Sequence, residues 1–193
     1  YGTFTTHRPV APPPGPTART RWPPRDRRWC PRRRSASARW GPAEAEALFA
    51  RLGPDPLRRD GRPGPFLDAL RARRTPVGAA LLDQSLIAGV GNVFRAEALF
   101  ACGIHPERPA SALSEDEARC LWDTVTRMLR DGVRRNRIAT VPAAERDRRE
   151  PEGRGKDRFV YHRAGLPCRR CGTAVVEKPL AGRRLFFCPS CQT

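Results

Sequence analysis

Residues 168–191 read CRRCGTAVVEKPLAGRRLFFCPSC and contain two C-x2-C pairs separated by sixteen residues. This spacing is typical of a tetrahedral zinc site in which each pair supplies two thiolates from a tight turn. Residues 174–179 and 184–187 predict the two strands of a hairpin, with a turn at residues 180–182. So short a hairpin cannot build a core of its own, and we therefore expect one structural zinc ion to supply much of its folding energy.

Four cysteines are the expected zinc ligands: Cys168, Cys171, Cys188 and Cys191. The alternative is a small secreted domain in which the same cysteines form two disulfides. It is disfavoured because Gly172 and Pro189 suit zinc-binding turns, and because no secretory signal is recognisable in the sequence.

The other three cysteines, Cys30, Cys102 and Cys120, have no ligand spacing. Cys102 and Cys120 lie in apolar helical patterns, which predicts that they are buried as small hydrophobic residues. No apolar run approaches the 18 residues that a transmembrane helix needs. These features fit a cytoplasmic protein without a membrane partner.

The composition indicates a polyanionic partner. The formal net charge is +17 with a pI near 11.2, a balance that favours nucleic acid. Only Lys156 and Lys178 are lysines, so almost all of the basic residues are arginines. Arginine suits bidentate phosphate recognition, but a GC-rich genome also enriches arginine codons, so the net charge is the stronger indication.

Residues 8–41 are dominated by proline and arginine, and such a stretch cannot bury enough apolar surface to become ordered. Trp22, Trp29 and Trp40 lie within it and could stack on nucleic acid. We expect this segment to be disordered or extended.

Residues 42 onward have helical patterns. Helices are expected over Pro42–Leu52, around residues 66–70, from Pro76 to Gln84 and, as the longest, over Ser114–Val133. Ser114 and Glu117 predict a capping box at the start of the longest helix, whose apolar stripe we interpret as core packing.

The second informative stretch is Gly89-Val-Gly91-Asn92, which stands between two apolar segments expected to be helical. Two glycines allow a tight turn and close approach of a ligand, and Asn92 is placed to cap the second helix. The free N–H groups at such a helix start form a phosphate-binding site. An ordinary turn between two helices would carry the same G-x-G-N pattern.

Leu81–Pro106 (LLDQSLIAGVGNVFRAEALFACGIHP) resembles the helix–two-turn–helix of the formamidopyrimidine-DNA glycosylase/endonuclease VIII family. Phe159–Cys168 (FVYHRAGLPC) and the remainder to Gln192 resemble the zinc finger of that family. The resemblance covers about residues 42–193. It implies a mainly α fold, in which a helical DNA-binding domain (42–141), a linker (142–158) and a zinc finger (159–193) follow a remnant of an N-terminal β-sandwich (1–41).

The resemblance also implies roles for particular residues. Asn92, with Gly89 and Gly91, would bind a phosphate flanking the lesion, and Arg183 at the zinc-hairpin turn would bind another. Glu97 corresponds to a family residue near the catalytic amine, although it could equally be an ordinary acid on a helix surface.

Family members are DNA-repair enzymes that excise oxidised bases and then cleave the strand by β/δ-elimination, using an N-terminal proline amine and an adjacent glutamate. Here the sequence begins Tyr1-Gly-Thr-Phe-Thr-Thr. We therefore expect an N-terminally truncated, inactive chain whose catalytic residues cannot be assigned, with residues 8–41 arising from a pair of compensating reading-frame errors.

The implied partner is double-stranded DNA containing damaged bases or abasic sites, bound by a monomer associated with the nucleoid. Two alternatives remain. One is a non-catalytic, zinc-dependent DNA-binding fragment of such an enzyme. The other is an RNA-associated zinc ribbon, which would leave the G-V-G-N stretch unexplained.

Overall fold

The computed structural model describes residues 41–142 and 155–193. The expectations for residues 1–40, including the sandwich remnant, the tryptophans and Cys30, lie outside the described residues, as does most of the expected linker at 142–158. The chain divides into two compact units that meet between Phe49 and Ala50. In the first, the described element is α1 (Pro42–Phe49), and the carboxylate of Glu44 accepts a hydrogen bond from the N–H of Gly41 (2.8 Å).

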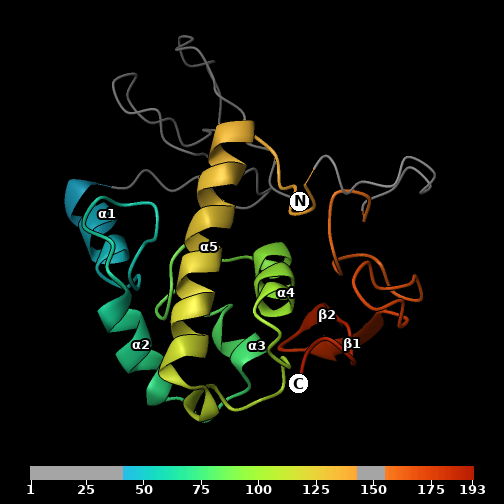
Figure 1. Ribbon diagram of the computed structural model, residues 1–193. Coiled ribbons are helices and arrows are strands. Elements are labelled where there is room, and N and C mark those ends of the chain that lie inside the picture. The colour runs from blue at the N-terminus through green and yellow to red at the C-terminus, as the bar shows by residue number, and fades with distance from the viewer. Residues whose placement is uncertain (1–40, 143–154) are drawn as a thin grey trace. The chain divides into compact units, whose positions relative to one another are not determined.

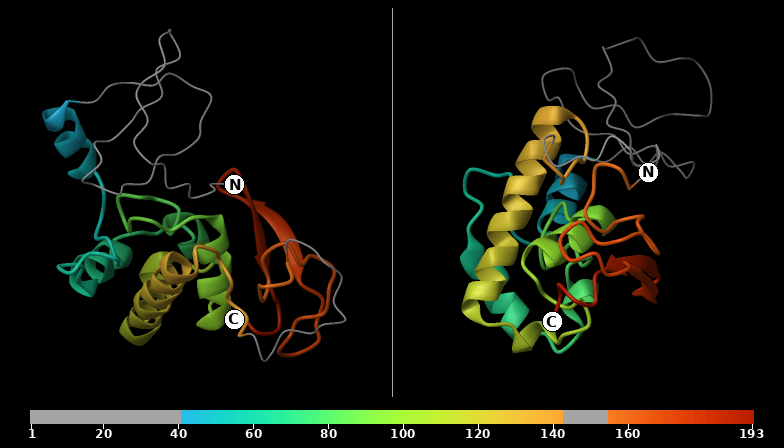
Figure 2. Two further views of the ribbon diagram at one scale, coloured as in Figure 1. Left: turned by 90° about the horizontal axis from the view of Figure 1, so that it is seen from above. Right: turned by 45° about the vertical axis from the view of Figure 1, so that its right-hand side comes forward.

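The second unit is mainly helical and ends in a two-stranded hairpin (Figures 1 and 2). Its elements are α2 (Pro63–Arg71), α3 (Val77–Ala80), α4 (Asn92–Ala101), the 3-10 turn η1 (Ala110–Ala112), α5 (Glu115–Arg135), β1 (Val176–Leu180) and β2 (Arg183–Phe187). The order of a helical part followed by a hairpin agrees with the prediction. Among the described helices, none is long and apolar enough to cross a membrane.

The longest helix, α5, begins as its sequence predicts. The Ser114 hydroxyl accepts a hydrogen bond from the N–H of Glu117 (3.1 Å), and the Glu117 carboxylate accepts one from the N–H of Ser114 (2.8 Å). This capping box satisfies N–H groups that the first helical turn leaves free. Asn136 ends the helix in the left-handed conformation, with φ of 50°.

The apolar stripe of α5 lies against α2 and α4 and forms the main core. The largest fully buried apolar side chains of this cluster come from four segments: Phe66, Leu70, Leu81, Leu86, Ile87, Leu99, Ile104 and Leu121. The rings of Phe66 and Trp122 lie 5.6 Å apart and join α2 to α5. The interpretation of the stripe as core packing is therefore confirmed except at its last residue, Val133, which is 66% exposed.

The expected helix from Pro76 to Gln84 is wrong in extent, because α3 stops at Ala80. The chain then continues through turns in which Leu81, Leu86 and Ile87 are all fully buried. A buried apolar run does not distinguish a helix from a series of tight turns, and here the turns supply as much of the core as a helix would.

Cys102 and Cys120 are half-buried and form a disulfide, so the prediction that they serve only as buried small hydrophobic residues is wrong. Their Cα atoms lie 6.1 Å apart, within the usual span of a disulfide. Cys102 ends α4 and Cys120 lies in the second turn of α5, and the two helices pack on each other. Tertiary packing thus brings together two residues whose sequence spacing gives no sign of pairing.

A second buried cluster joins the hairpin to α4. Ala96 and Phe100 of α4 pack with Val160, Val175 and Phe186. The hairpin thus shares a core with a helix of the preceding domain. This packing stabilises the hairpin in addition to the folding energy expected from zinc. The strands pair antiparallel, and β2 lies beside α4 (Figure 2).

Candidate nucleic-acid interface and metal centre

The turn before α4 is built by two glycines and a glutamine. Gly89 has φ of 86°, a conformation that side-chain-bearing residues rarely adopt. Gly91 has an ordinary extended backbone, and a Cβ built on it meets no atom of the described residues within 4 Å. The Gln84 side chain holds the turn by accepting from the N–H of Gly89 and donating to the carbonyl of Val90, both at 2.9 Å. The space beside Gly91 therefore leaves the backbone open to a ligand.

Asn92 does not cap α4 as the sequence suggested. Gly91 is the N-cap residue, and no side chain caps this helix end. The Asn92 amide instead donates to the carbonyl of Arg184 in β2 (2.8 Å) and accepts a hydrogen bond from Arg95. No side-chain cap therefore occupies the N–H groups of the first helical turn. Asn92 instead connects the start of α4 to the zinc hairpin.

Arg95 is fully buried and has no carboxylate partner among the described residues. Its guanidinium donates to the carbonyls of Gly78 (3.1 Å) and Arg184 (3.3 Å), and its Nε has no partner. Burial, together with the nearby charge of Arg183, lowers the pKa of Arg95 to about 10. Arg95 is still protonated at neutral pH, so an uncompensated positive charge lies beneath the start of α4.

Arg183 is the first residue of β2 and is exposed. It follows a turn in which Ala181 and Gly182 both have positive φ, as in a two-residue hairpin loop of type I′. Its neighbour Arg184 pairs instead with Glu177 on β1. Arg183 pairs across the hairpin with Leu180, whose carbonyl accepts a hydrogen bond from Arg95 (3.5 Å).

Glu97 is fully buried, so it is not an acid on the helix surface. Its carboxylate accepts hydrogen bonds from the backbone N–H groups of Phe159 (2.8 Å), Val160 (2.9 Å) and Tyr161 (2.8 Å), and from the Thr140 hydroxyl. Both carboxylate oxygens are thus occupied by partners from two other segments. Glu97 fixes the segment that leads into the zinc finger against α4.

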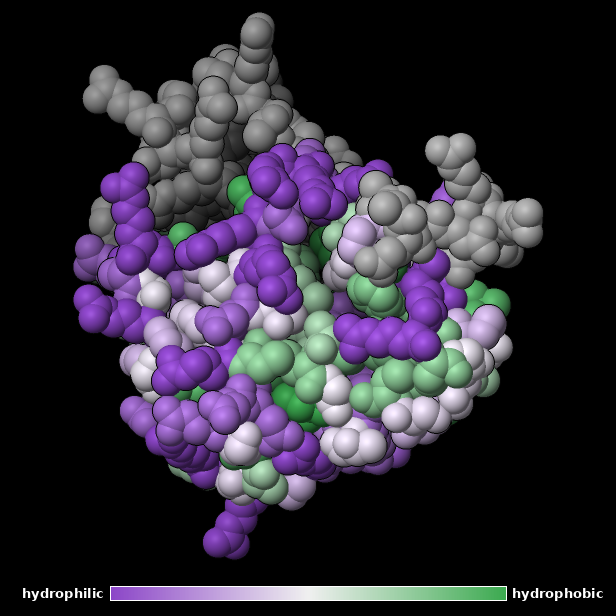
Figure 3. Space-filling view, in the orientation of Figure 1, coloured by the Kyte–Doolittle hydropathy of each residue, from purple (hydrophilic) through white to green (hydrophobic). Residues whose placement is uncertain are grey.

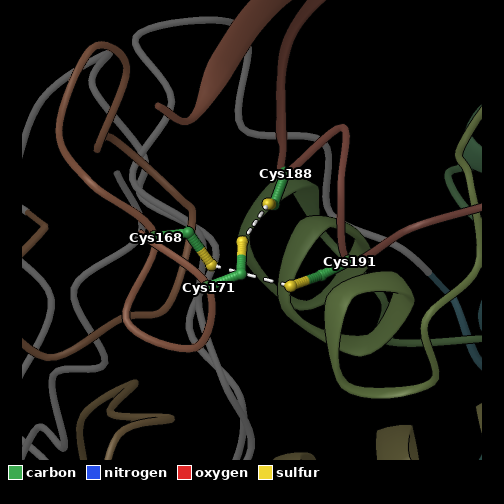
Figure 4. A group of neighbouring side chains, drawn as sticks. All are labelled: Cys168, Cys171, Cys188 and Cys191. Atoms are coloured by element: carbon green, nitrogen blue, oxygen red, sulfur yellow. Dashed lines mark hydrogen bonds between the residues drawn. The ribbon is translucent and has the colours of Figure 1, made fainter. Parts of the chain in front are cut away.

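The four predicted cysteine ligands come together at the end of the hairpin (Figure 4). Their sulfur atoms all lie within 4.8 Å of one another. The distance is 3.4 Å between Cys171 and Cys188, and 3.9 Å between Cys168 and Cys191. A tetrahedral zinc ion with Zn–S bonds of about 2.3 Å requires sulfur atoms about 3.8 Å apart. The spacing and the all-sulfur donor set therefore fit one closed zinc site.

The thiols also perturb one another. Burial and the neighbouring thiols raise the pKa of Cys188 and of Cys191, while hydrogen bonds with Thr173 lower the pKa of Cys171 to about 6. A bound cation would lower the pKa of all four thiols, because its positive charge stabilises the thiolate form.

Two residues of the finger attach it to α4 and to the segment that follows α4, and neither was predicted from the sequence. Arg170, between the first two cysteines, donates to the carbonyl of Phe100 (3.3 Å) and lies 4.5 Å above its ring. Gln192 is buried and links the N–H of Cys188 to the carbonyl of Ile104, both at 2.9 Å. Their partners are backbone groups and an aromatic face, which sequence patterns do not identify.

Two family models match the chain. The formamidopyrimidine-DNA glycosylase H2TH domain matches residues 52–142, and the zinc finger found in FPG and IleRS matches residues 165–193. The first therefore covers the helical elements from α2 to α5, and the second covers all four cysteines.

Curated relatives include endonuclease 8 1 of Mycobacterium tuberculosis, 43% identical over 153 residues, which cover 78% of this chain and 56% of that protein. Formamidopyrimidine-DNA glycosylase of Gluconobacter oxydans is 42% identical over 160 residues, 77% of this chain and 54% of that protein. The chain thus spans about half the length of the curated relatives it matches.

Solved structures agree. The MutM (Fpg) protein of Thermus thermophilus matches with a TM-score of 0.65 and 38% identity, over 80% of this chain and 58% of that one. Lactococcus lactis Fpg in complex with abasic-site DNA matches with a TM-score of 0.63 and 28% identity, over 77% and 54%. Through residues 52–142 and 165–193, the chain belongs to the formamidopyrimidine-DNA glycosylase/endonuclease VIII family.

Proposed function

We propose that residues 50–193 bind the DNA backbone for a DNA glycosylase/AP lyase that acts on oxidised bases. The observation that carries this proposal is the hydrogen bond between Asn92 and the carbonyl of Arg184, which joins residues 92 positions apart in sequence. It holds the start of α4 next to the strand that begins with Arg183. One phosphate would bind the free N–H groups of α4, and another would bind Arg183.

The electrostatics favour the same partner. Arg95 adds a buried positive charge without a carboxylate partner in the described chain, and Arg183 adds an exposed one. Two such charges beside a helix N-terminus attract phosphate, and the net charge of +17 adds a long-range attraction to DNA.

The substrate class is proposed from the relatives. Lactococcus lactis Fpg has been solved with DNA containing an abasic site and with DNA containing Fapy-dG. We propose that this chain likewise recognises duplex DNA with damaged bases or abasic sites, and that it takes part in base excision repair.

Salt-dependent binding tests the assignment of Arg183. Binding of the 193-residue chain to an abasic-site duplex should weaken with salt. Arg183→Ala should reduce the slope of log K against log salt by about 0.9, because one phosphate contact is lost. Arg184→Ala is the matched control, since that neighbouring guanidinium already pairs with Glu177. Equal losses in both variants would mean that hairpin charge in general, rather than an Arg183 contact, drives binding.

The lyase chemistry requires a nucleophilic amine, and the described residues contain two lysines, Lys156 and Lys178. Lys178 forms an ion pair with Glu107 at 2.6 Å, so its amine is already engaged on the surface of the finger. We propose that neither lysine attacks the sugar and that the described residues bind DNA without cutting it. Borohydride trapping on an abasic-site duplex should therefore give no adduct at either lysine. An adduct mapped to Lys156 or Lys178 would overturn this assignment.

A further inference from the structure

The charge of α5 is divided along its length. The first nine residues carry four acids and one arginine, whereas residues 127–137 carry five arginines and one acid. The helix dipole favours acids in the first turn and bases in the last. It accounts for Glu115 and for Arg134 and Arg135, but its effect does not reach Arg127 and Arg130, which lie before the last turn.

The basic end of α5 lies against the G-V-G-N turn. A Cβ built on Gly89 would lie 3.8 Å from both methyl carbons of Leu129. A Cβ built on Gly132 would lie 3.4 Å from the ring of Phe94, in the first turn of α4. Because successive helical residues are rotated by about 100°, Arg130 lies about 100° around α5 from Leu129, on the side away from Gly132 and Phe94. In Figure 3, hydrophilic side chains cover the upper, C-terminal end of α5.

The five arginines differ in how far they are already engaged. Arg134 and Arg135 pair with Asp131 at 2.8 Å and 3.8 Å, and Arg137 pairs with Asp157 at 3.5 Å. Arg127 donates to the hydroxyl of Thr124 (3.4 Å). Arg130 is exposed, and no hydrogen bond or ion pair joins it to any residue of the ranges 41–142 and 155–193. Arg130 is therefore the arginine of this group that is best placed to accept an external anion.

The surface beside Arg130 is open within the described chain. Val133, less than one turn further along on the same flank, is 66% exposed. The flank of Arg130 and Val133 thus adjoins a turn whose own backbone is open at Gly91. A polyanion bound at that turn would run past an unpaired guanidinium.

We propose that Arg130 binds a DNA backbone phosphate in addition to those assigned to the start of α4 and to Arg183. The proposal rests on the proposed function, because it needs DNA at the G-V-G-N turn. It extends the interface from the turn and hairpin onto α5. The contact is independent of base identity, so it should serve damaged and undamaged duplexes alike.

The test compares Arg130→Ala with Arg130→Lys and Arg119→Ala in the 193-residue chain, using an undamaged duplex. Arg130→Ala should lower the salt slope by about 0.9, so that its deficit relative to the unmutated chain shrinks about threefold between roughly 50 and 200 mM salt. Arg130→Lys should keep the slope, since it keeps the charge. Arg119 lies on the same face about 16 Å nearer the helix start and pairs with Glu115, so Arg119→Ala should change little.

The outcomes separate this proposal from the one on which it rests. If the unmutated chain binds and Arg183→Ala lowers the slope, but Arg130→Ala matches the unmutated chain, the α5 contact is wrong and the proposed function stands. If the unmutated chain shows no salt-dependent binding, both are wrong. Equal slopes in Arg130→Ala and Arg119→Ala, both below that of the unmutated chain, would show a general charge effect and overturn the Arg130 contact. Thermal unfolding should be the same for Arg130→Ala and the unmutated chain, because the side chain has no described partner to lose.

Discussion

The helical part and the zinc finger of this chain are stabilised by different means. The helices α2 to α5 surround a cluster of twenty buried residues, start their longest member with a capping box and carry a disulfide. The finger has two five-residue strands and four thiols, and the apolar side chains that it buries pack against Ala96 and Phe100 of α4. The finger therefore depends on the metal and on the helices, whereas the helices have a core without either thiols or strands.

The proposed DNA-binding residues lie where these two regions meet. Asn92 and Arg95 belong to α4, but both donate to the carbonyl of Arg184 in the hairpin. Loss of the finger would release the side chain of Asn92 even if α4 remained folded. The difference in stability between the regions thus predicts that DNA binding is lost before the helical fold.

The largest effect is expected from removal of a zinc ligand. Cys188→Ser should abolish zinc binding and unfold the finger, because a structural zinc site contributes on the order of 10 kcal/mol to folding. Metal analysis should find one zinc ion in the unmutated chain and none in the variant. The far-UV helical signal should persist, and DNA binding should fall to a nonspecific level.

If the variant loses helical structure along with zinc, the helices depend on the metal, and the claim that they are stable without the finger is wrong. Chelation of the unmutated chain offers a second route to the same state and should give the same helical signal.

A smaller effect, confined to the helices, is expected from loss of the disulfide. Cys102 and Cys120 are 18 residues apart, and closing a loop of this length in the unfolded chain is worth about 3 kcal/mol. The variant Cys102→Ser/Cys120→Ser should lower the free energy of unfolding by about that amount while retaining zinc. Thiol titration of the denatured chain should find two more thiols after reduction than before it. Equal counts would mean that the disulfide does not form.

The sequence predicted the elements whose signals are local. The Ser114–Glu117 capping box and the stripe of α5 lie within one helix. The two strands of the hairpin lie between the two C-x2-C pairs. Each of these patterns records contacts between residues close in the chain. They were therefore readable without knowledge of the tertiary structure.

The missed features depend on contacts between distant segments. Asn92 was expected to cap its own helix, but its partner is a carbonyl 92 residues away. Glu97 has its three backbone partners 62 to 64 residues away, and these N–H groups carry no sequence signature. The pairing of Cys102 with Cys120 likewise requires that α4 and α5 be already packed.

The smallest effect is expected from the residue that attaches the finger to α4. The guanidinium of Arg170 lies 4.5 Å from the centre of the Phe100 ring and 5.6 Å from that of Phe159, and it donates to a carbonyl in the last turn of α4. Because Arg170 is exposed, its cation–π contact and hydrogen bond should together contribute about 1 kcal/mol.

Arg170→Met keeps an apolar side chain over the rings but removes the charge and the donor. We expect it to retain all four thiolate ligands and to lower the free energy of unfolding by about 1 kcal/mol. It should also speed the release of zinc to a chromogenic chelator, because the first C-x2-C pair is held less firmly against α4. Arg183→Met is the matched control, since it removes the same charge from the same finger at an exposed side chain that makes no hydrogen bond or ion pair with the described residues. If both variants release zinc at the rate of the unmutated chain, the finger keeps its metal without its attachment to α4, and the dependence of the finger on the helices is confined to their shared apolar core.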